Sequence, residues 1–309
     1  MINYHKNKIK FNFDDKKIVE SYYRPFIKSN LYYDNYLNHR TGQMPKLFPT
    51  GSEENLLICV QSPGEKKDFS VLIVDKIPDL HLIGTCQCFP LYYYEPPTEG
   101  DLFNQTEMIR RDGITDYIFN RAKMLYGSVT KEDIFYYIYG FLHLPSYRKK
   151  FANELKKSLP RIILVPETSK FWKISQAGRN LAEIHLNYEN QPAPKDLIIE
   201  ITKEDYKIPK NMQLSKDKTT LTYNQFITIK NLPPRSFEYI VNGRSPLEWI
   251  IDRYQIKIDK DSQIENNPND WCTEHGDEKY IFNLILSLLT VSLKTLDIVD
   301  RLPEVTLDY

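Results

Sequence analysis

The chain has 309 residues and a formal net charge of zero. This length allows two domains or one large α+β unit with a substantial core. The balanced charge argues against a uniformly basic nucleic-acid-binding surface, but it allows a basic face that is offset by acidic surface elsewhere. The four cysteines show no C-x-x-C spacing, and the N-terminus lacks the apolar core of a signal peptide. We therefore expect free thiols in a reducing cytoplasm.

Residues 1–94 are expected to form a β-rich segment. Turn signals such as Pro63-Gly64 separate runs of β-branched and aromatic residues. These strand-like runs cover residues 31–33, 56–60, 69–74 and 88–94. The loop between the first two runs carries side chains with several hydrogen-bonding geometries, among them Asn38, Arg40 and Gln43.

Residues 95–100 (Glu-Pro-Pro-Thr-Glu-Gly) are the expected boundary between two domains, 1–94 and 101–309, because this stretch is stiff, polar and unsuited to continue a strand. Beyond it the hydrophobic pattern predicts helices. They cover residues 115–124, 130–142, 146–158 and 169–185, with a short buried strand at 161–165 and loops with short strands over 190–235. The expected fold class is α+β, with the β-rich N-terminal segment packed on a mixed, largely helical body.

Residues 239–254 are expected to form a strand, a tight turn and a capped helix. Asn242-Gly243 is a turn signal, since both residues tolerate positive φ. Ser245 occupies an N-cap position, and Glu248, three residues later, completes a capping box. Arg244 is thus expected at the mouth of the helix, beside free backbone N–H groups that would suit a phosphate. The alternative is a well-formed helix start with a surface Arg.

The most apolar run, residues 281–296, contains Asn283, Ser287, Thr290, Ser292 and Lys294. These polar residues predict an amphipathic core helix rather than a membrane span.

Several catalytic patterns are missing from the sequence. No two glycines are close enough to make G-x-G, which argues against a Rossmann loop, a P-loop and the cofactor-binding glycines of a methyltransferase. No Asn-Pro-Pro-aromatic motif for a flipped adenine is present. The histidines are scattered singly, and His275 near Cys272 does not make a zinc site. We expect no catalytic residue, no metal and no cofactor.

Several segments resemble one protein family, and they occur in order along the chain. The segment 241–249 (Val-Asn-Gly-Arg-Ser-Pro-Leu-Glu-Trp) resembles the C-terminal region of type ISP restriction–modification enzymes. Those enzymes join a nuclease, a helicase-like translocase, an adenine methyltransferase and a target-recognition domain in one chain. Further similar segments lie at 23–34, 130–140, 159–162, 177–182, 185–189, 259–260 and 266–269.

The resemblance implies a module that recognises a specific sequence in double-stranded DNA for phage defence. It implies that residues 1–94 lead from a methyltransferase into the specificity domain, and that 101–309 form the target-recognition domain. The partner would be the adenine methyltransferase and helicase portion of the same system, with no membrane involved. The chain would be a separate subunit, a truncated gene or a fragment, and would catalyse nothing alone. The alternative is a protein-interaction scaffold or an inactive remnant that does not bind DNA.

Two sets of side chains are candidates for contacting DNA. Basic side chains suit phosphates, and paired donors and acceptors suit base edges. The phosphate candidates are Arg148, Lys149, Lys150, Lys216, Lys218, Arg235 and Arg244. The base-reading candidates are Asn38, Arg40, Gln43, Lys170, Lys173, Gln176, Asn224 and Gln225. The resemblance implies that motifs shared by the family form the framework or bind phosphates, and that base readers lie in the less typical stretches 38–46, 168–176 and 204–230.

Overall fold

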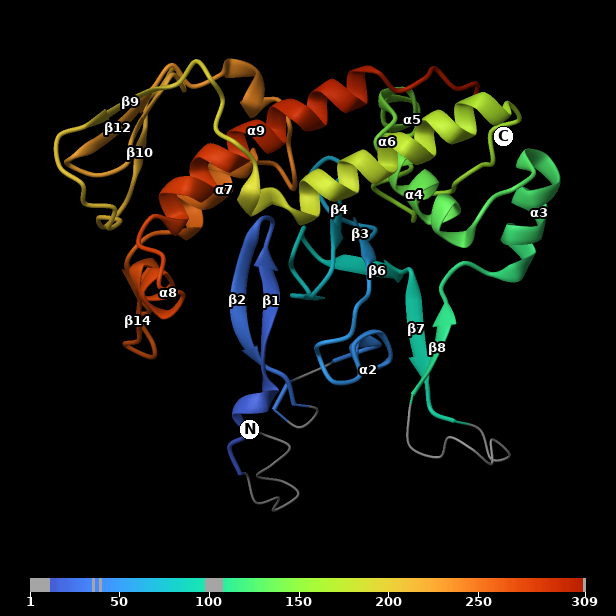
Figure 1. Cartoon of the computed structure of the whole chain (residues 1–309), viewed down its shortest axis with the longest axis horizontal. Coiled ribbons are helices and arrows are strands. Elements are labelled where there is room, and N and C mark those ends of the chain that lie inside the picture. Colours follow the sequence, from blue (N-terminus) through green and yellow to red (C-terminus); the bar gives the residue numbers. More distant parts are fainter. Residues whose placement is uncertain (1–11, 35–36, 39–40, 98–107, 308–309) are drawn as a thin grey trace. The chain divides into compact units, whose positions relative to one another are not determined.

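A computed structural model of the chain describes residues 12–34, 37–38, 41–97 and 108–307 (Figure 1). The chain forms two compact units, the first comprising Met1–Ala182 with Leu302–Tyr309 and the second Glu183–Arg301. Helices and several small sheets occur in both, which confirms the expected α+β class. The expected boundary at 95–100 stays a prediction. Strands dominate before it and helices follow soon after it, but the division between the compact units lies at residues 182 and 183.

The first unit contains three small sheets. One has the strand order β2-β1-β5, one β4-β3-β6, and the third is the two-stranded β7–β8 ribbon. The elements are η1 Asp15–Lys17, β1 Ile18–Arg24, β2 Ile27–Tyr32, α2 Met44–Leu47, β3 Leu57–Gln61, β4 Val71–Val74, β5 Ile77–Pro78, β6 Cys86–Pro90, β7 Tyr92–Glu95 and β8 Ile109–Asp112. All residues of β3 and β4 are buried, as their nearly continuous apolar runs predict.

Four helices complete the first unit: α3 Asp116–Tyr126, α4 Lys131–Phe141, α5 Pro145–Lys150 and α6 Thr168–Leu186, whose last residues enter the second unit. Thr130 is the N-cap of α4, and Asp133 completes a capping box with it. Helices α4 and α6 cross very closely at two glycines. A Cβ at Gly178 would lie 1.9 Å from the carbonyl oxygen of Tyr136, and one at Gly140 2.3 Å from that of Ile174, so neither position accepts a side chain.

The predictions for residues 146–165 are wrong in two respects. The third helix ends at Lys150 and is followed by turns, and residues 161–165 form no strand in the described chain. Tyrosine hydroxyls satisfy their carbonyls instead. Tyr126 donates to Val165 O at 2.6 Å, Tyr137 to Ile163 O at 2.6 Å and Tyr147 to Arg161 O at 3.2 Å. Phenols from three helices therefore replace the hydrogen bonds of a sheet ladder.

The second unit contains a four-stranded antiparallel sheet of order β10-β11-β12-β9 and the long helix α9. Its elements are η2 Tyr188–Asn190, β9 Ile198–Ile201, β10 Gln213–Leu214, β11 Thr220–Thr222, β12 Ile227–Lys230, η3 Pro234–Phe237, α7 Pro246–Arg253, β13 Lys257–Ile258, β14 Glu265–Asn266, α8 Pro268–Glu274 and α9 Tyr280–Asp300. β13 and β14 pair as a separate two-stranded sheet.

Helix α9 is the core of the second unit. By length and composition alone it could cross a membrane, but 67% of its apolar window is buried inside the protein. Its polar residues have partners there: Ser287 donates to Tyr188 O at 2.5 Å, and Thr295 Oγ1 lies 2.9 Å from Nε2 of His185. These contacts agree with the predicted amphipathic core helix.

The capped-helix prediction for residues 239–254 is confirmed except for its strand. Ser245 and Glu248 form the capping box, and Asn242 and Gly243 have φ of 49° and 81°. The preceding residues form no strand, however, because η3 occupies 234–237 and Val241 makes only an isolated bridge to Arg244.

Candidate nucleic-acid interface

Helix α6 brings three base-reading candidates onto one face. Lys170, Lys173 and Gln176 are three residues apart and so follow one another along the helix surface. Lys173 and Gln176 are exposed. Lys170 pairs with Glu167 at 2.9 Å, and Gln176 donates to Asn180 Oδ1 at 2.9 Å. An exposed helix face with a cation and an amide has the chemistry that a DNA groove accepts.

The three basic residues of α5 have different surroundings. Arg148 is half-buried, donates from Nε to Leu142 O at 2.7 Å and lies over the Phe69 ring. Lys150 donates to the carbonyl of Leu307. Lys149 is exposed and extends the basic character of the helix into solvent. Of the three, Lys149 is the side chain best placed for a phosphate.

In the second unit, the remaining loop candidates lie at opposite ends of β11. Lys216 and Lys218 belong to the turn that precedes it, whereas Asn224 and Gln225 belong to the turn that follows it. Lys218 pairs with Glu248 at 2.7 Å, while Lys216 and Gln225 are exposed.

Asn224 has a structural task. Its Nδ2 donates to Asp205 O and Lys207 O at 2.7 and 3.1 Å, and its Oδ1 accepts from the N–H groups of Phe226 and Ile227, both at 2.9 Å. Because the buried amide already uses its donors and acceptors in these bonds, we do not propose Asn224 as a base reader.

Arg235 and Arg244 are both engaged within the second unit. Arg235 binds the carboxylates of Asp297 and Asp300, which joins η3 to α9. Arg244 points along α7 to Asp252, with Nη1 and Oδ2 2.7 Å apart, rather than toward the helix mouth. That mouth holds the carboxylate of Glu248 instead, and a fixed negative charge there disfavours a second anion.

The loop 38–46 is described only in part. Asn38 Oδ1 accepts from the backbone N–H of Asp34 at 2.7 Å, which closes a tight turn. Gln43 is exposed and lies at the N-cap position of α2 without a capping side-chain bond. Arg40 lies outside the described residues, so its part in an interface stays a prediction.

The β7–β8 ribbon carries polar and aromatic side chains that no sequence motif marks as functional. Figure 1 shows it extending away from the helices of the first unit. Tyr93 lies opposite Arg111, and Tyr94 lies opposite Arg110. Arg110 and Arg111 are exposed, and the Arg111 Nε is 3.5 Å from the Glu95 carboxylate. Only the pairing of the two strands reveals that Tyr93 and Tyr94 lie opposite Arg111 and Arg110.

The base of the ribbon is held tightly. Asn55 donates to Tyr92 O at 2.8 Å and accepts from Tyr92 N–H at 3.1 Å. A Cβ at Gly113 would lie 2.0 Å from Pro90 O, so this position requires glycine. The ribbon therefore leaves the body of the unit in a fixed direction.

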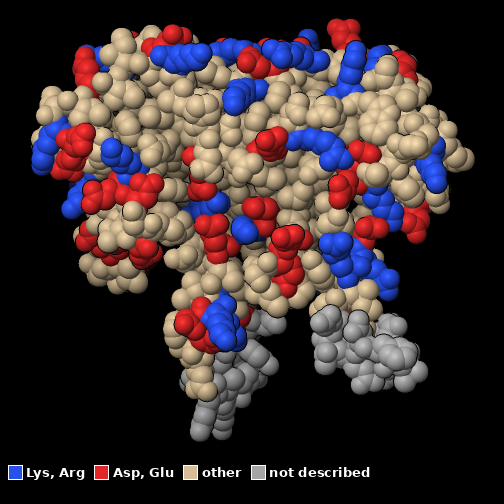
Figure 2. Space-filling model, in the orientation of Figure 1, with Lys and Arg blue, Asp and Glu red and all other residues tan. Residues whose placement is uncertain are grey.

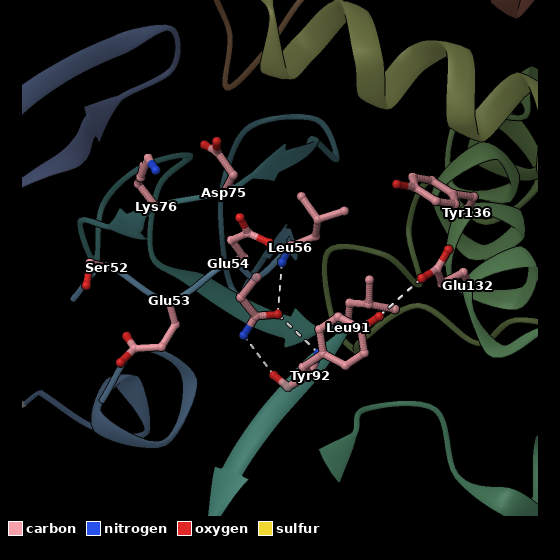
Figure 3. Close-up of a pocket in the computed structure, with 11 residues that line it drawn as sticks. Ser52, Glu53, Glu54, Leu56, Asp75, Lys76, Leu91, Tyr92, Glu132 and Tyr136 are labelled. Carbon is pink, nitrogen blue, oxygen red and sulfur yellow. Dashed lines mark hydrogen bonds between the residues drawn. The ribbon is translucent and has the colours of Figure 1, made fainter. Parts of the chain in front are cut away.

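A pocket of about 300 Å³ lies beside the ribbon (Figure 3). Its walls bear the acidic side chains of Glu53, Glu54, Asp75 and Glu132 against one basic side chain, Lys76. Burial and the hydrogen bond to Glu132 raise the pKa of the Tyr92 hydroxyl. This net negative lining repels phosphate, so we do not place DNA backbone in the pocket.

Positive and negative side chains intermingle over the face in Figure 2, in line with the balanced composition. On the face shown, charge alone does not identify an interface, so the candidates rest on local geometry.

A family model described as the Type ISP C-terminal specificity domain matches residues 1–284. Three solved structures are similar to this chain. The DNA-bound, ATP-dependent Type ISP restriction-modification enzyme LlaBIII is 36% identical with a TM-score of 0.88, and the match covers 99% of this chain and 19% of that one. A nuclease-deletion mutant of the Type ISP enzyme LlaGI with a DNA substrate mimic is 39% identical with a TM-score of 0.83, covering 99% and 26%.

The third structure is a cryo-EM complex of DrdV with DNA, 28% identical with a TM-score of 0.82, covering 98% of this chain and 30% of that one. The chain thus spans less than a third of the length of each of these proteins. A search of curated proteins found no match.

Proposed function

This chain belongs to the Type ISP C-terminal specificity domain family, and we propose on that basis that it recognises a specific sequence in double-stranded DNA. The observation that carries the proposal is the similarity over 98–99% of the chain to proteins solved with DNA bound. Since nearly every part of the chain has its counterpart there, the proposal rests on a whole module rather than on a single motif.

We assign the phosphate contacts to exposed lysines that lack a carboxylate partner among the described residues, chiefly Lys149 and Lys216. Such contacts fix register and supply affinity without reading sequence. For Lys218, Arg235 and Arg244, a phosphate would have to displace or share a carboxylate that each already binds.

We assign the contacts with base edges to exposed side chains on two elements of the first unit. Helix α6 offers Lys173 and Gln176, and the β7–β8 ribbon offers Arg110 and Arg111. The major groove admits either an α-helix or a two-stranded ribbon, and an Arg there suits guanine O6 and N7. In the second unit, Gln225 is the exposed candidate.

The module would serve an adenine methyltransferase and helicase portion that this chain does not contain. It would hold the target so that its adenine enters that methyltransferase, and it would catalyse nothing alone. The missing glycine pair and Asn-Pro-Pro motif support this. Calorimetric titration of the chain with S-adenosylmethionine should show no saturable heat. A micromolar binding isotherm would show that the chain carries a methyltransferase site.

The DNA proposal is tested by selecting duplexes from a randomised pool on the purified chain and then probing the bound duplex with dimethyl sulfate. This reagent methylates guanine N7, which faces the major groove. We expect one enriched sequence and protection of guanines within it. If Arg111 reads one of them, Arg111→Ala restores methylation at that guanine, while Arg121→Ala on the exposed surface of α3 does not.

One observation favours the alternative of a protein-interaction module. The edge strand β9 exposes Ile198, Ile199 and Ile201 by 54%, 37% and 42%. An apolar edge strand is a surface that another protein strand can extend. A chain that selects no duplex from the pool but pairs with the enzyme's other portion would establish this second function.

A further inference from the structure

Three cysteine side chains meet on one face of the buried sheet of the first unit. Cys59 of β3 lies directly opposite Cys88 of β6, and their sulfur atoms are 3.5 Å apart. Cys86 lies two residues from Cys88 and so points to the same face. Neither the family assignment nor the proposed DNA contacts involve these thiols.

The backbone pairing places Cys59 and Cys88 at the closer kind of cross-strand position. Ser62 donates its N–H to Thr85 O at 2.8 Å, which makes that opposed pair a hydrogen-bonded one. Hydrogen-bonded and non-hydrogen-bonded pairs alternate along an antiparallel ladder, and Cys59–Cys88 is three steps away. It is therefore a non-hydrogen-bonded pair, with Cα atoms about 4.5 Å apart. That spacing lies within the disulfide range of about 4.4–6.8 Å.

The third thiol lies beside this pair. Hydrogen bonds from the thiols of Cys59 and Cys88 lower the pKa of Cys86, against the opposing effect of burial. The Cys86 thiol also donates to Asp79 O at 3.8 Å. Cys88 is the most exposed member of the cluster.

We propose that this thiol cluster is an oxidation site, at which a peroxide converts Cys59 and Cys88 into a cross-strand disulfide. Cys88 loses its proton to solvent, and its sulfur attacks a peroxide oxygen. The O–O bond breaks, Cys88 becomes a sulfenic acid, and the second oxygen leaves as water after taking up a proton from solvent. The Cys59 sulfur then attacks the Cys88 sulfur, and the sulfenic hydroxyl leaves as water with the Cys59 proton.

The two steps together oxidise each of the two sulfurs by one electron and reduce both peroxide oxygens to water, with hydrogen peroxide as the only oxidant required. The disulfide would tie β3 to β6 at Cys88, four residues before the β7–β8 ribbon begins at Tyr92. The oxidation site does not depend on the DNA proposal, and a separate experiment tests it.

The test treats the full folded chain with hydrogen peroxide in the presence of a metal chelator, followed by thiol alkylation and peptide mass mapping. We expect a linked peptide pair that contains Cys59 and Cys88, a mass loss of two hydrogens, and reversal by dithiothreitol. Cys59→Ser should stop the reaction at a sulfenic acid on Cys88 that dimedone traps.

Cys272→Ser, which alters a buried thiol of the second unit, is the matched control and should change nothing. The peptide map of the wild-type chain shows whether Cys59 and Cys88 become linked, even if a cluster variant fails to fold. Full alkylation of Cys59 and Cys88 after peroxide treatment of the folded wild-type chain would overturn the proposal, as would a link that forms equally with Cys272.

Discussion

Arg244 binds Asp252 along the side of helix α7, with Nη1 2.7 Å from Oδ2, and its guanidinium carbon lies 5.1 Å from the centroid of the Trp249 ring. Arg253 reaches the same carboxylate at 3.1 Å and the same ring at 5.6 Å. Two guanidinium groups thus share one carboxylate and one indole. This cluster holds Arg244 against the side of α7.

Replacement of Arg244 by Ala should therefore act on stability more than on DNA binding. The pair is about one third exposed, so its loss should lower the free energy of unfolding by no more than about 1 kcal/mol. DNA affinity per folded molecule should be unchanged, as thermal melts and salt-titrated binding will show. A uniform loss of affinity with an unchanged melting temperature would instead restore Arg244 as a phosphate contact.

Lys149→Ala provides the contrasting case. This exposed side chain of α5 should contribute little to folding, within about 0.5 kcal/mol. If it binds a phosphate, affinity should fall alike for all duplexes, and the slope of log affinity against log salt should lessen by about one. The control is Lys123→Ala on α3. Equal salt slopes for wild type and Lys149→Ala would remove Lys149 from the interface.

Gln176→Ala tests base reading on α6. A side-chain amide that pairs with a base edge contributes roughly 1–3 kcal/mol of discrimination at one position. The variant should therefore bind the selected duplex more weakly, yet bind a duplex altered at that position as well as wild type does. Asn180, its neighbour on the helix, offers a matched control as Asn180→Ala. An equal loss on every duplex would mean that Gln176 reads no base.

Tyr137→Phe tests the hydroxyl support of residues 161–165. Removing the hydroxyl leaves Ile163 O without this 2.6 Å bond, and Val165 N–H without its 3.3 Å contact. A buried polar group without a partner costs about 1–3 kcal/mol, so urea unfolding should show a loss of that size. Tyr117→Phe, at a position that is 73% exposed, should leave stability unchanged. Equal stability of both variants would mean that water replaces the phenol.

The pH dependence of stability should have a contribution from Asp133. Burial acts to raise its pKa, but hydrogen bonds from Thr130 and Arg179 outweigh burial and lower it below 3.8. A lowered pKa in the folded state stabilises the fold above the ordinary value, and this stability is lost as pH falls through the folded value. Between neutral pH and about pH 3, wild type should therefore lose more stability than Asp133→Asn. Parallel urea-derived stability curves for the two proteins would contradict this assignment.

The sequence was most informative where local chemistry determines the structure. Thr130 with Asp133 and Ser245 with Glu248 form capping boxes within four residues of chain, so short spacing alone identifies them. The positive φ of Asn242 and Gly243 follows equally from residue type. The same local reasoning found the buried run of β3.

The sequence was least informative where contacts with residues far away in the chain determine the structure. Residues 161–165 look like a strand, but tyrosines from three helices take the place of a partner strand, and no local pattern reveals this. The phosphate role of Arg244 stays a prediction, but a sequence does not show that its side chain turns toward Asp252. The side chains of the β7–β8 ribbon were not among the predicted DNA contacts for the same reason, since Tyr93 and Arg111 lie opposite each other only once β7 and β8 pair.

The central claim is that this chain discriminates between DNA sequences. The most direct measurement is the ratio of its affinities for the selected duplex and for the same duplex with its recognition sequence scrambled, at physiological salt. Specific binding should exceed non-specific binding by a factor of at least about 10³, and both affinities should fall as salt rises. Equal affinities for the two duplexes, or no salt-dependent binding of either, would contradict the account.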